Sequence, residues 1–160
     1  MSYLTELLRP EQIQLDLRGA DKAGVIKELV GLVPEVRKEP GHQELFLHAL
    51  LERERLHTTA IGDGIALPHA RNPMGGLLKR SILVFGRHAA GVPFGAIDNK
   101  PVQMLFLIAS PNLTDHLAML SRLSRVLRDL KLRNALLGAK NSQEVLSSME
   151  EAEKRTAKPG

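Results

Sequence analysis

The residues from Arg53 to Arg71 carry the strongest signs of chemistry in this sequence. They read RERLHTTAIGDGIALPHAR, and His69 directly follows Pro68. A proline removes a backbone donor and stops a strand, so we expect His69 at a strand end, exposed in a cleft. Imidazole titrates near neutral pH, and such a histidine is suited to nucleophilic or acid–base work.

Two features near His69 indicate an anion. Arg53 extends the apolar helical stripe that begins at Phe46, where an unpaired guanidinium would be costly to bury, so it needs a carboxylate or a phosphoryl group as partner. Gly62 and Gly64 allow the backbone to approach an anion without interference from a Cβ atom. The residues alone leave a structural interpretation open, in which Arg53 pairs with an Asp or Glu and His69 is a satisfied loop histidine.

His116 is the second candidate. It lies in the first turn of a predicted helix, after a cap formed by Asn112 or Thr114, and shares one face with Leu120 and Leu123. The free N–H groups and the dipole at a helix N-terminus favour anions. The alternative is a histidine at the core edge that bonds a backbone carbonyl. Two inward histidines and an inward arginine, without a cysteine or a catalytic-serine signature, favour phosphoryl handling over hydrolysis.

Alternating and continuous apolar runs predict the elements that hold these residues. Helices are expected after an Asp21 cap, after Pro40-Gly41 and around His116, with a short amphipathic stretch near 142–149, and Pro34 is expected to end or kink the first of them. The predicted strands are 13–17, 65–67, 81–85 and 102–109. Because helices and strands interleave, we expect an α/β fold: a three-layer α/β/α sandwich with a mixed central sheet flanked by helices.

Composition excludes several classes of protein. The chain has 160 residues, 43% of them apolar and 25% charged, which is typical of a soluble globular domain. We expect one domain over residues 1–150 and a loose, flexible tail over 151–160. The absence of cysteine excludes disulfides, thiolate zinc sites and thiol catalysis. No apolar run reaches the roughly 20 residues that cross a bilayer, and the start lacks a signal peptide, so we expect a cytoplasmic protein without membrane insertion.

The formal net charge of +4 raises the question of an acidic partner. Arg122, Arg125 and Arg128 lie opposite the leucine face of their helix, which predicts a solvated face or a docking site for an acidic protein. No helix-turn-helix or aromatic-interleaved basic patch accompanies them, so nucleic acid is not expected. The other histidines lack metal-ligand spacing, and carboxylates do not cluster with histidines, so no metal and no metal-dependent hydrolase is expected.

The stretch from Arg53 to Arg71 resembles the signature of the type-2 enzyme IIA domains of the bacterial sugar phosphotransferase system, the mannitol/fructose class. The family pattern has an arginine, a Thr-Gly-Ile-Gly-like loop and a Pro-His pair whose histidine is phosphorylated. These correspond to Arg53, residues 59–62 and Pro68-His69. Ala60 departs from the pattern, since the family often has glycine there, and this loop is expected to be stiffer.

Two further segments carry the resemblance. A second family histidine, before a helix late in the chain, corresponds to His116 in Thr114-Asp115-His116-Leu117. The run from Phe94 to Val102 is similar to the nitrogen-regulatory branch, in which an Ala-Ile-Asp-Asn-x-Pro-Val run occurs. The resemblance therefore covers nearly the whole chain.

The resemblance implies phosphoryl transfer through a histidine. Nε2 of His69 would attack the phosphohistidine of HPr or its nitrogen-branch analogue, while a hydrogen bond orients the other ring nitrogen. Arg53 and His116 would neutralise the phosphoryl charge. The residues expected to bind the phosphoryl oxygens are Thr59, Gly62 and Gly64. The family requires no metal, nucleotide or other cofactor.

The implied output is regulatory. A nitrogen-regulatory IIA component would bind a downstream regulatory protein in a phosphorylation-dependent way, because the phosphoryl group adds close to two negative charges. The alternative is a sugar-specific, fructose/mannitol-type enzyme IIA that passes phosphate to a IIB partner in sugar uptake. A binding module that works without phosphorylation is disfavoured, since His69, Arg53 and His116 are all present.

Overall fold

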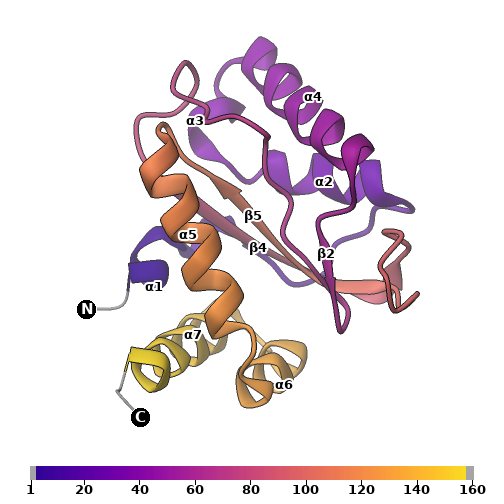
Figure 1. Cartoon of the computed structure of the whole chain (residues 1–160), viewed down its shortest axis with the longest axis vertical. Helices are drawn as coiled ribbons and strands as arrows, with labels where there is room; N and C mark the ends of the chain where they lie inside the picture. Colours follow the sequence, from indigo (N-terminus) through magenta and orange to yellow (C-terminus); the bar gives the residue numbers. More distant parts are fainter. Residues whose placement is uncertain (1–2, 158–160) are drawn as a thin grey trace.

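Strands form one mixed sheet at the centre of the structure, and helices cover both of its faces (Figure 1). The computed structural model describes residues 3–157. The five strands are ordered β1-β4-β5-β3-β2 across the sheet. Their bounds are β1 Ile13–Gln14, β2 Ala60–Gly62, β3 Ile65–Ala66, β4 Ile82–Val92 and β5 Val102–Ala109. The pairs β1–β4 and β3–β5 are parallel, whereas β4–β5 and β2–β3 are antiparallel. The predicted mixed sheet is confirmed.

The helices divide into two layers. One face carries α2 (Lys22–Val30), α3 (Pro34–Arg37) and α4 (Pro40–Leu56), and the other carries α1 (Tyr3–Leu7), α5 (Leu113–Val126), α6 (Leu130–Gly138) and α7 (Ser142–Ala157). A short 3-10 turn, Pro10–Gln12, precedes β1. Within residues 3–157 no helix is both long and apolar enough to cross a bilayer.

Strand β5 joins the two hydrophobic cores. Met104, Phe106 and Ile108 pack with the helices of the α1, α5, α6 and α7 face, while the side chains between them pack on the α2, α3 and α4 face. A strand that is buried on both faces reads as a continuous apolar run, since alternation requires one face in water. The prediction of a strand over 102–109 is therefore confirmed residue for residue.

Several local predictions differ from the structure. Strand β3 ends at Ala66, one residue before the predicted end at 67. Strand β1 covers Ile13–Gln14 only, and β4 continues to Val92 along the antiparallel ladder with β5. Helix α2 ends at Val30, before Pro34, which neither kinks nor ends it. Instead Pro34 occupies the first turn of α3, where the missing N–H has no helical partner to lose and the fixed φ suits a helix.

The expected loose tail begins inside a helix. Helix α7 continues to Ala157, and both Ala152 and Glu153 are buried. The Glu153 carboxylate accepts hydrogen bonds from the backbone N–H groups of Leu4 and Thr5, each at 3.0 Å, and so caps the start of α1. This partner lies about 150 residues away, so the composition of 151–157 carries no sign of it. Residues 158–160 of the predicted tail lie outside the described residues.

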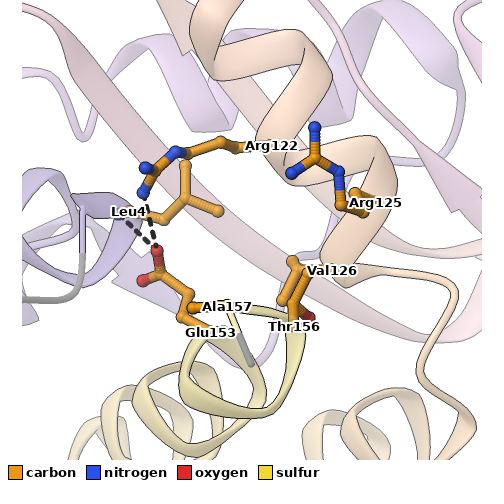
Figure 2. Close-up of a pocket in the computed structure, with 7 residues that line it drawn as sticks. All are labelled: Leu4, Arg122, Arg125, Val126, Glu153, Thr156 and Ala157. Atoms are coloured by element: carbon orange, nitrogen blue, oxygen red, sulfur yellow. Dashed lines mark hydrogen bonds and ion pairs between the residues drawn. The ribbon is translucent and has the colours of Figure 1, made fainter. Parts of the chain in front are cut away.

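The arginines of α5 are exposed, as predicted, but one of them also has a structural partner. Arg122 lies 3.8 Å from the Glu153 carboxylate and 4.8 Å over the Tyr3 ring. Figure 2 shows Arg122 and Arg125 on one side of a cavity of about 80 Å³, with Glu153 opposite and Leu4 beside Arg122. This corner joins α1, α5 and α7.

Candidate functional site

His69 lies where strand β3 stops but its backbone continues along the sheet. The Pro68 carbonyl accepts the Ile108 N–H at 3.0 Å, and His69 forms an isolated parallel bridge with Ile108 of β5. The backbone of His69 is therefore fixed to the central strand, while its side chain is half-buried. The expectation of a histidine at a strand end is confirmed.

A backbone contact sets the tautomer of His69. Nδ1 lies 2.7 Å from the Leu67 carbonyl oxygen. A carbonyl oxygen only accepts hydrogen bonds, so Nδ1 carries the ring proton of the neutral imidazole. The lone pair of the neutral ring therefore lies on Nε2. The predicted orienting bond at the second ring nitrogen is present.

His116 is the nearest imidazole. The two ring centroids lie 5.5 Å apart, with the planes tilted by 56°. Asn112 caps α5 by accepting the Asp115 N–H at 2.9 Å, which places His116 in the first turn of the helix. The His116 side chain is buried, and its Nδ1 has no hydrogen-bond partner among the described residues. The two histidines that the sequence singled out therefore lie next to each other in the structure.

Both histidines are kept neutral by their surroundings. Burial lowers the pKa of His69 below its ordinary value, the Arg53 charge lowers it further, and the Leu67 hydrogen bond and the Glu54 charge oppose them. Burial also lowers the pKa of His116, and the neighbouring His69 adds to that effect. A neutral imidazole has a free lone pair, so His69 can act as a nucleophile at neutral pH.

Arg53 lies in the last turn of α4, and its charge acts on His69. Its guanidinium donates to the His57 carbonyl at 2.5 Å, and within residues 3–157 no carboxylate lies close enough to form an ion pair with it. Arg53 and Ala70 both line a cavity of about 270 Å³, together with Leu56 and residues 71–74. Glu52 and Arg71 also line this cavity, and the Arg53 charge acts on His69, the residue before Ala70.

The structure corrects the expected position of Arg53 on its helix. Arg53 is only half-buried, whereas the next residue, Glu54, is buried. The apolar stripe from Phe46 through Leu50 continues at intervals of four to Glu54, whereas the expected stripe ran to Arg53. Glu54 is thus the residue of this stretch that was missed, and the same periodicity pointed to it.

Thr59 lies at the His69 end of the β2–β3 hairpin. Its carbonyl accepts the Leu67 N–H at 3.0 Å, and its backbone N–H donates to Glu54. The side chain is buried, and its hydroxyl has no partner within the described chain. A buried hydroxyl without a hydrogen-bond partner costs about 1–3 kcal/mol of folding free energy. A hydrogen bond from Thr59 to an acceptor atom of a bound group would remove that cost.

The two predicted phosphate-binding glycines lie at the other end of the hairpin. Gly62 and Gly64 have φ values of 94° and 76° and form the β2–β3 turn. The Asp63 N–H between them donates to the Asp98 carboxylate at 2.8 Å. Residues 64–69 run extended beside β5, so Gly64 lies roughly 16 Å from His69 at about 3.3 Å a residue. The structure does not bring these glycines to the histidines.

The same contact explains part of the Phe94–Val102 run. Asp98 binds the β2–β3 turn and also accepts the Lys100 N–H at 3.1 Å, and these bonds lower the pKa of its carboxyl.

Among residues 3–157 no three His, Asp or Glu side chains gather as a metal site requires. Of the other residues predicted for the site, His116 lies next to His69, Arg53 acts on its charge, and Thr59 bonds to Leu67.

The sequence has curated relatives of two kinds. It is 38% identical over 137 residues to a fructose-specific EIIA component of Haloferax volcanii, covering 84% of this chain and 86% of the relative. It is 32% identical over 146 residues to a nitrogen regulatory protein of Bradyrhizobium diazoefficiens, covering 90% and 92%. It is also 32% identical to the fructose-specific EIIABC component of Bacillus subtilis, of whose length it spans 24%.

Solved structures give the same picture. The nitrogen regulatory protein IIA-Ntr of Neisseria meningitidis superposes with a TM-score of 0.81 at 29% identity, covering 92% of this chain and 99% of that one. The mannitol enzyme IIA of Escherichia coli, in complex with phosphorylated mannitol enzyme IIB, gives 0.73 at 26% identity, covering 89% and 98%. Residues 6–152 match the family described as phosphoenolpyruvate-dependent sugar phosphotransferase system, EIIA 2. With His69 and His116 paired on this fold, the chain belongs to the type-2 EIIA family of that phosphotransferase system.

Proposed function

We propose that this protein carries a phosphoryl group on Nε2 of His69. The observation that carries the proposal is the 2.7 Å contact between Nδ1 of His69 and the Leu67 carbonyl. It keeps the ring proton on Nδ1, so that the lone pair of the neutral ring is available on Nε2 without any prior proton transfer.

The reaction is an exchange between two imidazoles. The Nε2 lone pair of His69 bonds to the phosphorus of a phosphohistidine on HPr or its nitrogen-branch analogue. As the donor's N–P bond breaks, its electron pair returns to the donor ring nitrogen. His69 gains and loses no proton, because its ring proton stays on Nδ1. Such a transfer depends on positioning and on stabilising the charge of the phosphoryl oxygens.

Three groups support that charge stabilisation. Arg53 is a cation without a carboxylate partner among the described residues, and it lines the cavity beside Ala70. Thr59 and His116 each hold a buried polar atom that nothing in the described chain satisfies. A phosphoryl group on His69 would provide acceptor oxygens for these donors, and charge-assisted bonds of this kind are among the strongest in proteins.

Exposed apolar side chains support a protein as partner. Leu113 and Leu117 flank His116 along α5 and are 56% and 55% exposed, and Leu56 is 64% exposed at the rim of the Arg53 cavity. Exposed apolar side chains grouped beside a site are typical of protein docking surfaces. A donor or acceptor protein that packs on them would bring its own histidine or cysteine to His69.

The output that we propose is nitrogen-regulatory. The run Ala96-Ile97-Asp98-Asn99 and the likeness to nitrogen regulatory proteins support it. Ile97 is 92% exposed at the tip of the β4–β5 loop and is free to contact a target. Phosphorylation adds close to two negative charges at the site, enough to favour one partner and repel another.

The alternative is a sugar-specific enzyme IIA that hands its phosphoryl group to a IIB partner. The relative with 38% identity is a fructose-specific EIIA component, and a neighbouring structure is a complex of an enzyme IIA with a phosphorylated enzyme IIB. These two similarities support the sugar-specific function as the alternative.

The test is the intact mass of the protein after incubation with enzyme I, phosphoenolpyruvate and HPr or its nitrogen-branch analogue. We expect the wild-type protein to gain one acid-labile phosphoryl group and His69→Gln to gain none. Equal labelling of His69→Gln would move the phosphorylated residue elsewhere, and no labelling with either donor would overturn the carrier function. Rapid onward transfer to a fructose-type IIB domain would favour the sugar-specific alternative.

A further inference from the structure

Glu54 is a buried carboxylate beside the candidate site that the proposed mechanism does not use. Its side chain is 3% exposed, at the end of α4 and next in sequence to Arg53. A buried carboxylate is costly unless hydrogen bonds and a cation compensate for the lost water. The partners of Glu54 therefore indicate what the residue holds in place.

Those partners come from two other segments. The Thr59 backbone N–H donates to both carboxylate oxygens, at 3.2 and 3.1 Å. The Lys22 ammonium, from the first turn of α2, lies 3.3 Å from the carboxylate and 4.9 Å from the centre of the Phe94 ring. Glu54 thus connects α2, α4 and the segment that leads into β2.

The contacts do not end at Thr59. The Thr59 carbonyl accepts the Leu67 N–H at 3.0 Å, and the Leu67 carbonyl accepts Nδ1 of His69 at 2.7 Å. The N–H and the carbonyl of Thr59 belong to successive peptide groups, and so do those of Leu67. The hydrogen bonds from the Glu54 carboxylate to the ring of His69 therefore form a series that is joined through the backbone of these two residues. A displacement of Thr59 would therefore move the carbonyl that holds Leu67, and through Leu67 the carbonyl that holds the ring of His69.

The charge of Glu54 also reaches His69. The pKa of His69 is raised by the Glu54 carboxylate and lowered by the Arg53 guanidinium, two adjacent residues with opposite effects on one ring. This agrees with the geometry, in which the carboxylate and the imidazole lie at the two ends of one short series of hydrogen bonds.

We propose that Glu54, held by Lys22, is a positioning residue for phosphoryl transfer: through Thr59 and Leu67 it fixes the ring of His69 with Nε2 free to react. The proposal rests on the proposed function of His69. Glu54 touches neither the donor nor the phosphoryl group. It fixes the carbonyl of Leu67, and through that carbonyl it sets both the tautomer and the direction of the nucleophile.

The chain contains a matched control. Glu153 is also buried, accepts two backbone N–H groups, from Leu4 and Thr5, and lies 3.8 Å from an arginine, Arg122. Its partners belong to the α1–α7 corner of Figure 2 and are not bonded to His69. Loss of Glu153 removes contacts of the same kind as loss of Glu54, but outside the series that leads to the nucleophile.

The experiment compares Glu54→Ala, Glu54→Gln and Glu153→Ala with the wild type in two measurements. The first is the His69 tautomer, from ¹⁵N NMR of histidine-labelled protein above pH 7.5, and the second is the rate of phosphorylation by phosphorylated HPr. For Glu54→Ala we expect a signal from the tautomer with the proton on Nε2 and a rate about tenfold lower. Glu54→Gln keeps an oxygen for the Thr59 N–H and should restore both. Glu153→Ala should lower the melting temperature and change neither.

The outcomes separate the two proposals. The positioning role is overturned if Glu54→Ala has a lower melting temperature but keeps the wild-type His69 tautomer and phosphorylation rate. It is also overturned if Glu54→Gln and Glu54→Ala are equally defective in tautomer and rate. If Glu54→Ala does not fold, Lys22→Met takes its place. Methionine keeps an apolar side chain near the Phe94 ring but leaves the Glu54 carboxylate without its cation. An unchanged His69 tautomer and phosphorylation rate in Lys22→Met would also overturn the positioning role of Glu54. If wild-type protein is not phosphorylated at all, the carrier function fails, while the tautomer still tests the series of hydrogen bonds.

Discussion

His69 and His116 carry the same side chain 5.5 Å apart, yet the protein prepares the two rings differently. His69 follows a strand, is half-buried and has its Nδ1 bound to the carbonyl of Leu67. His116 sits in a helix, is 5% exposed and has a buried Nδ1 without a partner in the described chain. A backbone hydrogen bond fixes the tautomer of His69. Among the described residues, only packing holds the ring of His116 in place.

The difference indicates that His69 and His116 have different roles in phosphoryl transfer. A nucleophile must have its lone pair in a defined place before the reaction begins, and backbone hydrogen bonding provides that for His69. A group that stabilises charge needs its partner only when the charge arrives, so an unmatched donor is acceptable beforehand. We therefore expect loss of His69 to remove the reaction and loss of His116 to slow it.

The largest partial effect is expected for His116→Leu. Leucine fills the buried position but offers no donor to phosphoryl oxygens, so the rate of phosphorylation by phosphorylated HPr should fall on the order of 10²-fold. The measurement is single-turnover phosphorylation followed by intact mass. A complete loss of labelling, equal to that of His69→Gln, would mean that the two histidines do not have distinct roles.

A smaller effect is expected when the positive charge beside the pair is removed. Arg53→Ala should slow phosphorylation about tenfold, or roughly 1.4 kcal/mol, and leave the circular dichroism spectrum unchanged. Arg55→Ala is the control, because Arg55 lies on the same helical turn but pairs with Glu52 on the surface at 2.6 Å. Equal rates for the two variants would remove Arg53 from the site.

Phosphorylation itself should change His116. In the free protein, burial and the neighbouring His69 lower the pKa of His116. A dianionic phosphoryl group favours the charged imidazolium, so the pKa of His116 should rise when His69 is phosphorylated. An NMR titration of both forms measures this. An unchanged pKa would place the phosphoryl group away from His116.

The finest test concerns the pH dependence of the nucleophile. Because burial and Arg53 lower the pKa of His69, the ring stays mainly neutral at pH 6.5 and gains its proton only at lower pH. The His69 NMR titration should therefore have its midpoint below 6.5. In Arg53→Ala the midpoint should move to higher pH, since a repelling cation is lost; a move to lower pH would contradict the assigned direction.

The same depressed pKa affects stability. The unfolded chain binds a proton at His69 near pH 6.5, whereas the folded chain does so only at lower pH. The protein therefore loses free energy of unfolding as the pH falls from 6.5 to the lowered pKa, and no further loss from this group follows below it.

Local signals in the sequence were enough for the central strand and for His69, but not for the edge strand β2. The continuous apolar run Val102–Ala109 predicted the central strand, and Pro68 predicted where the neighbouring strand stops. Both signals act within a few residues: burial on two faces removes alternation, and a proline removes a ladder donor. The strand end then determines where His69 lies.

Features that depend on distant partners were not predictable in this way. Glu153 looks like part of a charged tail, and only its bonds to Leu4 and Thr5 explain why it is buried. Helix α6 was missed because only Leu132 and Leu136 of its residues are buried, a stripe too short to recognise. Glycines 62 and 64 suit both a tight turn and an anion loop, and composition does not distinguish the two.

The bond between Glu153 and α1 has a consequence for the order of synthesis. Helix α1 is synthesised before the carboxylate that caps it, which lies 149 residues later in the chain. Leu4, a buried core residue, therefore has no complete environment until α7 has emerged and docked. During translation α1 cannot reach its final packing before α7 has been made, so the α1–α7 corner is expected to close later than the sheet and the α2–α4 layer.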